Sequence, residues 1–199
     1  MRSARAGSAR SAERRGRGAG AAVLAAGIAA TLGAAWAGAP DNGAIRFTAA
    51  QMGTPLQGGF RDYDVAIDFD PQQPGRGSVH AHVAVASVNA GSREADDLLR
   101  SGGFFDAAHF AQASFDADAF EPQGAGRFLA RGSFTLKGHT VHLPVSFTVA
   151  AGPQGRWFDG SFAISRLDFA VGQGEWSDTS TLDDKVEVAF HLLQPRPAP

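Results

Sequence analysis

Histidine is the residue type in this sequence best suited to chemistry, because imidazole binds metal ions and exchanges protons near neutral pH. His80 and His82 lie two positions apart in an alternating segment, so both side chains project from one face of a strand. This spacing occurs in metal sites, but the two lie opposite the apolar residues and imply no third ligand. His139 and His142 point to opposite faces. The pattern favours solvated surface histidines over a metal centre.

Other reactive groups also lack a catalytic setting. No serine stands in a Gly-x-Ser-x-Gly segment. The acid pairs Asp96-Asp97 and Asp183-Asp184 are typical of a solvated helix and a turn. The glycine-rich segments 152–155 and 172–174 precede no helix, so neither predicts a phosphate loop. The sequence therefore predicts a protein that is not an enzyme and that has no metal and no cofactor.

The N-terminal segment predicts export. Six arginines and one acid precede an uncharged Ala/Gly/Leu/Val run from Gly18 to Ala37, which ends in an Ala-x-Ala pattern. We expect residues 1–37 to be a signal peptide cleaved after Ala37, and residues 38–199 to form one periplasmic domain. The alternatives are an uncleaved membrane anchor and a disordered tail. Arg14-Arg15 is a weak match to a twin-arginine signal.

Composition narrows the partners of the remaining 162 residues. They keep 12 of the 18 basic and 19 of the 20 acidic residues, a net charge of −7. This balance argues against nucleic acid and against an anionic membrane surface. The absence of cysteine excludes disulfides and thiol chemistry.

Alternation of apolar and polar residues predicts an antiparallel β protein. The clearest element is a hairpin over 125–150 that reverses about Lys137-Gly138-His139-Thr140. A short helix over 92–100 interrupts the strands, with Ser92 as N-cap and Leu98 and Leu99 on its buried side. The predicted strands are 45–49, 63–69, 79–87, 113–119, 128–136, 141–149, 158–164 and 186–192.

These elements predict the fold class all-β: an eight-stranded antiparallel barrel with one helical excursion after the third strand, with a two-sheet sandwich as the alternative. The inward set contains small residues that leave space, which favours a dry cavity for an apolar ligand. An equally weighted alternative is that inward phenylalanines fill this space. The small residues are Ala81, Ala113, Ala117, Ala119, Ala130, Gly132 and Gly160.

Several ordered motifs carry a resemblance to a known family. They are Ser87, Leu98-Leu99-Arg100-Ser101, Phe104-Phe105-Asp106, Ala113-Ser114-Phe115, the segment 132–138, Pro144-Val145, the segments 164–169 and 172–176, and Val186-Glu187-Val188. Together they resemble the YceI-like family over 44–193. The Gly-x-Gly-x-Trp segment at 172–176 is similar to the branch found beside membrane b-type cytochromes.

The resemblance implies a lipocalin-like periplasmic barrel that holds a long isoprenoid lipid, polyprenyl or quinone-type, without chemistry on it. A surface-acting accessory of a membrane b-type cytochrome, a metal-dependent hydrolase and a homodimer are the other hypotheses. Arg166 and Asp168 match a family motif, either as an ion pair at a loop base or as a headgroup contact. The ligand-binding residues we expect are Phe60, Tyr63, Val65, Val83, Val85, Phe115, Phe134, Val145, Phe147, Phe162 and Phe190, with Leu98, Leu99, Phe104, Phe105 and Trp176 at the mouth.

Overall fold

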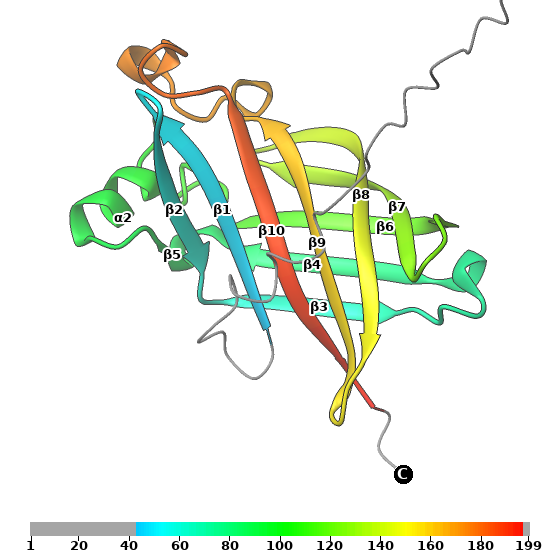
Figure 1. Cartoon of the computed structure of the whole chain (residues 1–199). Coiled ribbons are helices and arrows are strands. Elements are labelled where there is room, and N and C mark those ends of the chain that lie inside the picture. Colours follow the sequence, from blue (N-terminus) through cyan, green and yellow to red (C-terminus); the bar gives the residue numbers. More distant parts are fainter. Residues whose placement is uncertain (1–42, 197–199) are drawn as a thin grey trace, which may run out of the picture.

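The computed structural model describes residues 43–196, which form a strongly curled sheet with one helix at one end (Figure 1). The predicted signal peptide, residues 1–37, lies outside the described residues. Within 43–196, no helix is long and apolar enough to cross a membrane.

The ten strands form one antiparallel sheet in the order β3-β4-β6-β7-β8-β9-β10-β1-β2-β5. The strands are β1 (Gly43–Gln51), β2 (Thr54–Phe60), β3 (Tyr63–Asp68), β4 (Ser78–Ala84), β5 (Val88–Asn89), β6 (Gln112–Pro122), β7 (Arg127–Leu136), β8 (His139–Ala151), β9 (Gly155–Ser165) and β10 (Lys185–Pro195).

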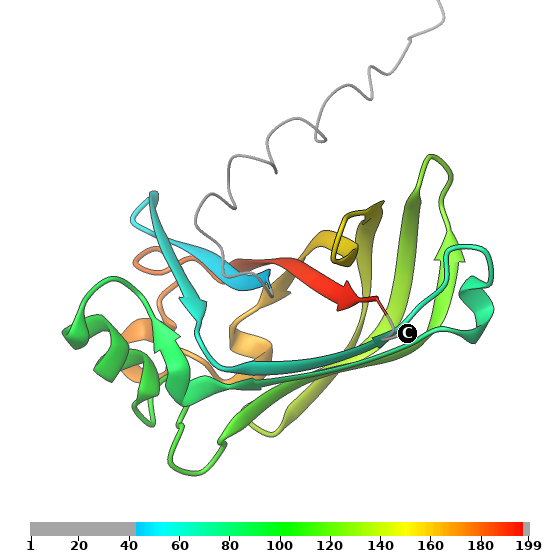
Figure 2. The same ribbon diagram turned by 90° about the horizontal axis from the view of Figure 1, so that it is seen from below.

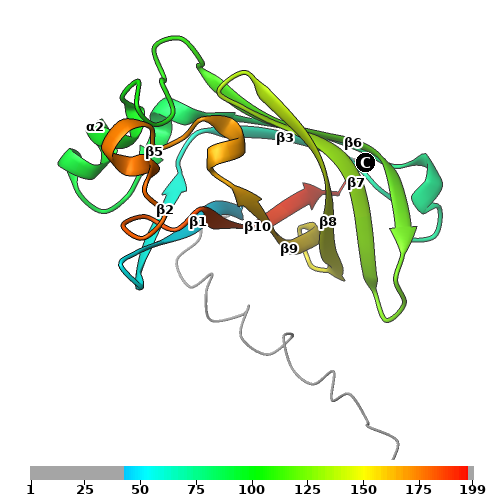
Figure 3. The same ribbon diagram turned by 90° about the horizontal axis from the view of Figure 1, so that it is seen from above.

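The sheet curls until its two edge strands belong to one bent hairpin (Figures 2 and 3). β2 continues into β3, and β4 continues into β5 through the 3-10 turn η2 (Val85–Ser87). At the bend, the Arg61 N–H donates to the Ser87 carbonyl (3.3 Å) and the Ala84 N–H donates to the Asp62 carbonyl (3.0 Å). The Ser87 hydroxyl accepts from the Arg61 and Asp62 N–H groups and donates to the Ala84 carbonyl. Ser87 therefore holds together the hairpin that joins the ends of the sheet.

The predicted all-β, lipocalin-like architecture is confirmed, but the sheet has ten strands rather than eight. The predicted strand 79–87 ends at Ala84, and β2 is absent from the prediction. β2 shows no alternation because Gly58 stands where a side chain would be expected. A Cβ on Gly58 would lie 2.3 Å from Cζ of Phe47, so the Phe47 ring occupies that place.

The β7–β8 hairpin forms as predicted, with its reversal confined to Lys137 and Gly138. Their φ angles are +50° and +78°, the pattern of a type I′ turn. Lysine is unusual at such a φ. Its Nζ donates to the carbonyls of Gly102 (2.8 Å) and Ala170 (2.9 Å), which ties the turn to two neighbouring loops.

The predicted helix is confirmed as α2 (Arg93–Arg100), and the Ser92 hydroxyl accepts from the Ala95 N–H (3.1 Å). Arg100 donates to the carbonyls of Ala86 and Val88, which fixes the helix against η2 and β5. The expected burial of Leu98 is wrong, since this side chain is 40% exposed. The helix lies over an opening rather than over a packed core.

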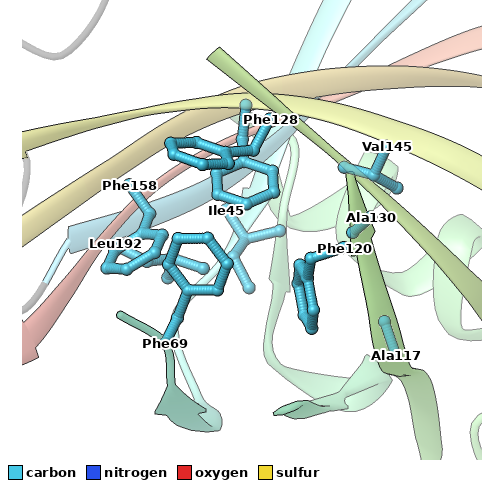
Figure 4. Packing of buried hydrophobic residues seen from close by; sticks show 10 residues of the cluster. Ile45, Phe69, Ala117, Phe120, Phe128, Ala130, Val145, Phe158 and Leu192 are labelled. Atoms are coloured by element: carbon cyan, nitrogen blue, oxygen red, sulfur yellow. The ribbon is translucent and has the colours of Figure 1, made fainter. Parts of the chain in front are cut away.

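Aromatic rings fill the end of the barrel farthest from α2 (Figure 4). Phe69 is 1% exposed, and its ring centroid lies 5.0–5.8 Å from those of Phe120, Phe128, Phe147 and Phe158. Edge-to-face packing of this kind adds stability beyond the buried area alone. This end of the barrel is therefore closed, and the α2 end is where a ligand could enter.

Candidate functional site

A large apolar cavity opens at the α2 end of the barrel. Its volume is about 430 Å³, and its walls come from β1, β2, β4, α2, the segment 104–105, β6, β7, β9, the loop 166–182 and β10. Its polar lining residues are Gln51, Gln57 and Arg166. We call it the outer cavity. Its lining residues are Ile45, Phe47, Ala49, Gln51, Pro55, Leu56, Gln57, Phe60, Val83, Ala90, Ala95, Leu98, Leu99, Phe104, Phe105, Ala113, Phe134, Leu136, Ile164, Arg166, Val171, Trp176, Leu182, Val186 and Val188.

A smaller inner cavity of about 100 Å³ lies deeper in the barrel. The two cavities share five wall residues, so they abut: Ile45, Val83, Ala113, Phe134 and Val188. The remaining lining residues of the inner cavity are Ile67, Val79, Ala81, Ser114, Phe115, Phe120, Ala130, Val145, Phe147, Phe158, Phe162, Phe190 and Leu192. Phe120, Phe147 and Phe158 also contact Phe69, so the aromatic cluster forms part of the wall of this cavity.

The two cavities bring together most of the residues expected from sequence. The outer cavity is lined by Phe60, Leu98, Leu99, Phe104, Phe105 and Trp176. The inner cavity is lined by Phe115, Val145, Phe147, Phe162 and Phe190, while Val83 and Phe134 line both.

Three expected residues line neither cavity. Val85 is 1% exposed and packs in the hydrophobic cluster beside the outer cavity, while Val65 and Tyr63 pack against the cluster around Phe69. The Tyr63 hydroxyl is buried without a hydrogen-bond partner among residues 43–196. Burial raises the pKa of Tyr63.

The inward glycines do not leave the space that their size suggests. A Cβ on Gly132 would lie 2.5 Å from Cζ of Phe115, and one on Gly160 would lie 2.4 Å from Cζ of Phe190. A phenylalanine ring from the neighbouring strand therefore lies over each glycine. Empty space remains beside Ala81, Ala113 and Ala130, which do line the inner cavity.

Some residues that line the cavities are not among the ligand-binding residues predicted from sequence. Phe47, Ile164 and Val188 are inward residues of predicted strands. The alternation that marks them as inward is the signal that could have placed them among the ligand-binding residues. Leu56 lies on the unrecognised strand β2. Leu182 lies in a loop, where no periodicity marks an inward side chain.

Aromatic side chains frame the mouth. The Phe104 ring lies 5.8 Å from that of Trp176, and Phe105 packs against Phe47 (6.5 Å) and Phe60 (5.9 Å). Phe104 and Phe105 are 5% and 8% exposed. The segment between α2 and β6 therefore forms a fixed part of the cavity wall.

Arg166 is the buried charge beside the outer cavity, with an exposed fraction of 2%. It donates to four backbone carbonyls: Asp183 (3.0 Å), Val171 (2.9 Å), Gly172 (3.1 Å) and Leu182 (2.7 Å). Burial lowers the pKa of Arg166, and the nearby Asp184 carboxylate opposes this effect.

These four carbonyls come from both ends of the loop that carries Trp176. Arg166 therefore anchors the loop base through carbonyls, rather than through an ion pair with Asp168, which was one of the two roles expected for this motif. The Asp184 carboxylate accepts from the Ser165 hydroxyl (3.0 Å) and the Leu167 N–H (3.1 Å), so it supports the same loop base.

Three of the six histidines, His80, His109 and His191, each pair with one acid. His80 Nδ1 lies 2.8 Å from Asp116, and His191 Nδ1 lies 2.6 Å from Asp159 with its ring stacked on Trp157. Among residues 43–196, no three or more His, Asp or Glu side chains group so as to hold a metal ion.

The curled sheet and its apolar interior define a barrel of the ligand-binding kind. The chain belongs to the YceI-like domain family, whose sequence model matches residues 36–193. A UPF0312 protein of Shewanella sp. (strain ANA-3) is 28% identical over 134 residues, which cover 64% of this chain and 70% of that protein.

Two solved structures share the fold. Burkholderia cenocepacia BcnA superposes with a TM-score of 0.75 at 34% identity, over 76% of this chain and 96% of that chain. A polyisoprenoid-binding domain from Saccharophagus degradans superposes with a TM-score of 0.64 over 79% of this chain and 97% of that domain. At 15% identity, it shows the fold alone.

Proposed function

We propose that this chain is an exported, periplasmic protein that binds a long isoprenoid lipid, polyprenyl or quinone-type, in its barrel. The observation that carries the proposal is the outer cavity of about 430 Å³ with almost wholly apolar walls. Small-molecule sites commonly measure about 300–1,000 Å³. An apolar cavity of about 150 Å³ stays dry and binds benzene, so a larger one suits a longer hydrocarbon.

The choice of an isoprenoid rests on the family and on one neighbour of the same fold. The Saccharophagus degradans domain is described as polyisoprenoid-binding, and its chain has the same curled sheet. Family membership and the apolar cavity support extending that ligand class to this protein.

Binding requires burial of apolar surface and no bond-making. Each Å² of ligand surface removed from water contributes roughly 25 cal/mol. A chain entering past Trp176 would follow the outer cavity to Phe134, which lines both cavities. Movement of the shared side chains would admit its end to the inner cavity.

The position of the Gly-x-Gly-x-Trp segment at 172–176 favours this proposal over a surface role beside a membrane b-type cytochrome. Trp176 lines the outer cavity and packs against Phe104. A tryptophan used for a protein partner would be expected on the outer face. Its position suits a residue of the cavity wall.

The test is lipid extraction of protein purified from its native host, followed by mass spectrometry. We expect a long-chain isoprenoid in the wild type and less of it in Phe134→Trp, because the larger ring narrows the passage between the cavities. Phe110→Trp is the matched control, since Phe110 packs over Gly138 and lines neither cavity. Wild-type lipid content and affinity in Phe134→Trp would refute the assignment.

A further inference from the structure

The exposed large apolar side chains among residues 43–196 lie around the mouth. Met52 is 74% exposed, Leu56 43% and Leu98 40%. Leu56 and Leu98 line the outer cavity, and Met52 follows Gln51, which also lines it. Figure 1 shows the β1–β2 hairpin and α2 at the same end of the barrel. We call these three residues the rim.

Met52 occupies a position that its residue type does not favour. Gln51 pairs with Thr54 across a two-residue reversal, with φ of +46° at Met52 and +76° at Gly53. The first position of such a turn strongly favours Asn, Asp or Gly. An apolar side chain here is costly in conformation and finds little packing, which points to a use outside the folded chain.

The hairpin tip is nevertheless held in place. The Met52 N–H donates to the Thr181 carbonyl (3.0 Å), and the Asp183 N–H donates to the Ala50 carbonyl (2.9 Å). The same 181–183 segment contributes two carbonyls to Arg166. Backbone hydrogen bonds therefore hold the hairpin tip that carries Met52 in a fixed position.

The charge distribution identifies the kind of surface that the rim fits. No charged residue occurs from Phe47 to Phe60, a stretch that covers most of β1 and all of β2. The nearby 174–178 segment carries Glu175 and Asp178, and half-buried Trp176 lies between them. On α2, which carries Leu98, Arg93 pairs with Asp97, and Arg100 pairs with Asp96 and Asp97. The rim therefore offers an anionic surface no unpaired basic cluster, whereas neutral headgroups suit its apolar residues.

We propose that the rim docks on a bilayer of zwitterionic lipid, with Met52 and Leu56 entering the interface. This rests on the proposed function, because a barrel that binds a membrane lipid must meet the bilayer that holds it. Docking by the rim places the outer cavity against that bilayer. A lipid chain then passes from one apolar environment to the other with little exposure to water.

Met52→Asn tests this proposal without touching the cavity wall. Asn tolerates positive φ better than Met, so the hairpin should keep its fold. The matched control is Ala125→Asn, an exposed residue with φ of +52° in the β6–β7 turn at the opposite end. Protein from the native host would be floated with phosphatidylcholine vesicles, and transfer of an octaprenyl quinone from vesicles would be timed.

We expect Met52→Asn to lower vesicle binding and the transfer rate about tenfold, which corresponds to about 1.4 kcal/mol for burying much of one Met side chain. Ala125→Asn should match the wild type. Equal behaviour of wild type and Met52→Asn would overturn the proposal. So would a concentration-dependent dimer, abolished by Met52→Asn, that binds no vesicles.

Binding of the quinone from detergent, with no vesicle present, tests the proposed function separately from docking. If docking occurs as we propose, Met52→Asn binds quinone from detergent as well as the wild type does. If neither protein binds quinone from detergent while the flotation difference persists, the lipid-binding function fails and the docking surface stands.

Discussion

Replacing Arg166 with methionine should destabilise the domain by releasing the loop that carries Trp176. The guanidinium makes four hydrogen bonds of 2.7–3.1 Å to backbone carbonyls at both ends of this loop. Methionine can fill part of the volume, but it leaves all four carbonyls without this donor. Hydrogen bonds to a charged group contribute about 1.5–3 kcal/mol each.

The four contributions will not add in full, because a released loop can relax and admit water. We expect a loss of about 3–5 kcal/mol, the cost typical of removing one partner from a buried charged network. This is a large part of the 5–15 kcal/mol by which domains are usually stable. Lipid affinity should fall too, since Val171, Trp176 and Leu182 belong to the outer cavity wall.

The assay is urea unfolding followed by tryptophan fluorescence, with acrylamide quenching to report exposure of Trp176 and Trp157 together. The control is Arg131→Met, because Arg131 is 59% exposed and pairs with Glu121 on the surface, where ion pairs contribute little. If the Arg166 and Arg131 variants unfold at the same urea concentration, the Arg166 network does not hold the loop, and the reasoning is wrong.

Two further predictions test the packing. Gly160→Ala should lower the free energy of unfolding by about 1–3 kcal/mol, because the new Cβ would lie 2.4 Å from the Phe190 ring and 2.5 Å from the Ser146 carbonyl oxygen; an unchanged urea midpoint would contradict this. Tyr63, the only tyrosine of the chain, should titrate in ultraviolet absorbance above its ordinary pKa of 10.0, because burial raises its pKa. The folded state then keeps this proton longer than the unfolded state, so stability should fall as pH rises above 10, and Tyr63→Phe should remove that part of the loss.

The regular elements were largely predictable because their signals are local. Alternation marks which residues of β7 and β8 share a face, and Gly138 marks the reversal between them. Ser92 marks the start of α2 through its hydroxyl. Strand β2 was not predicted because Gly58 breaks the alternation. A side chain at position 58 would clash with the ring of Phe47 on another strand, and a sequence pattern does not show this contact.

The cavity was predictable in its chemistry and not in its shape. Alternation identifies Phe134, Phe147 and Ala113 as inward, and therefore predicts apolar walls. It cannot tell whether Phe115 fills the space over Gly132 or lines an opening, because ring placement depends on the neighbouring strand.

The sequence by itself determined an all-β barrel with an apolar interior, a helix after the third predicted strand and a family resemblance. The tertiary structure decided where that interior stays open. The ring of Phe69 contacts four other aromatic rings, and this cluster closes one end of the barrel. Arg166 donates hydrogen bonds to four carbonyls and holds the loop that carries Trp176 at the other end. Both depend on groups brought together by strand pairing and loop closure, and no local pattern records such distant contacts.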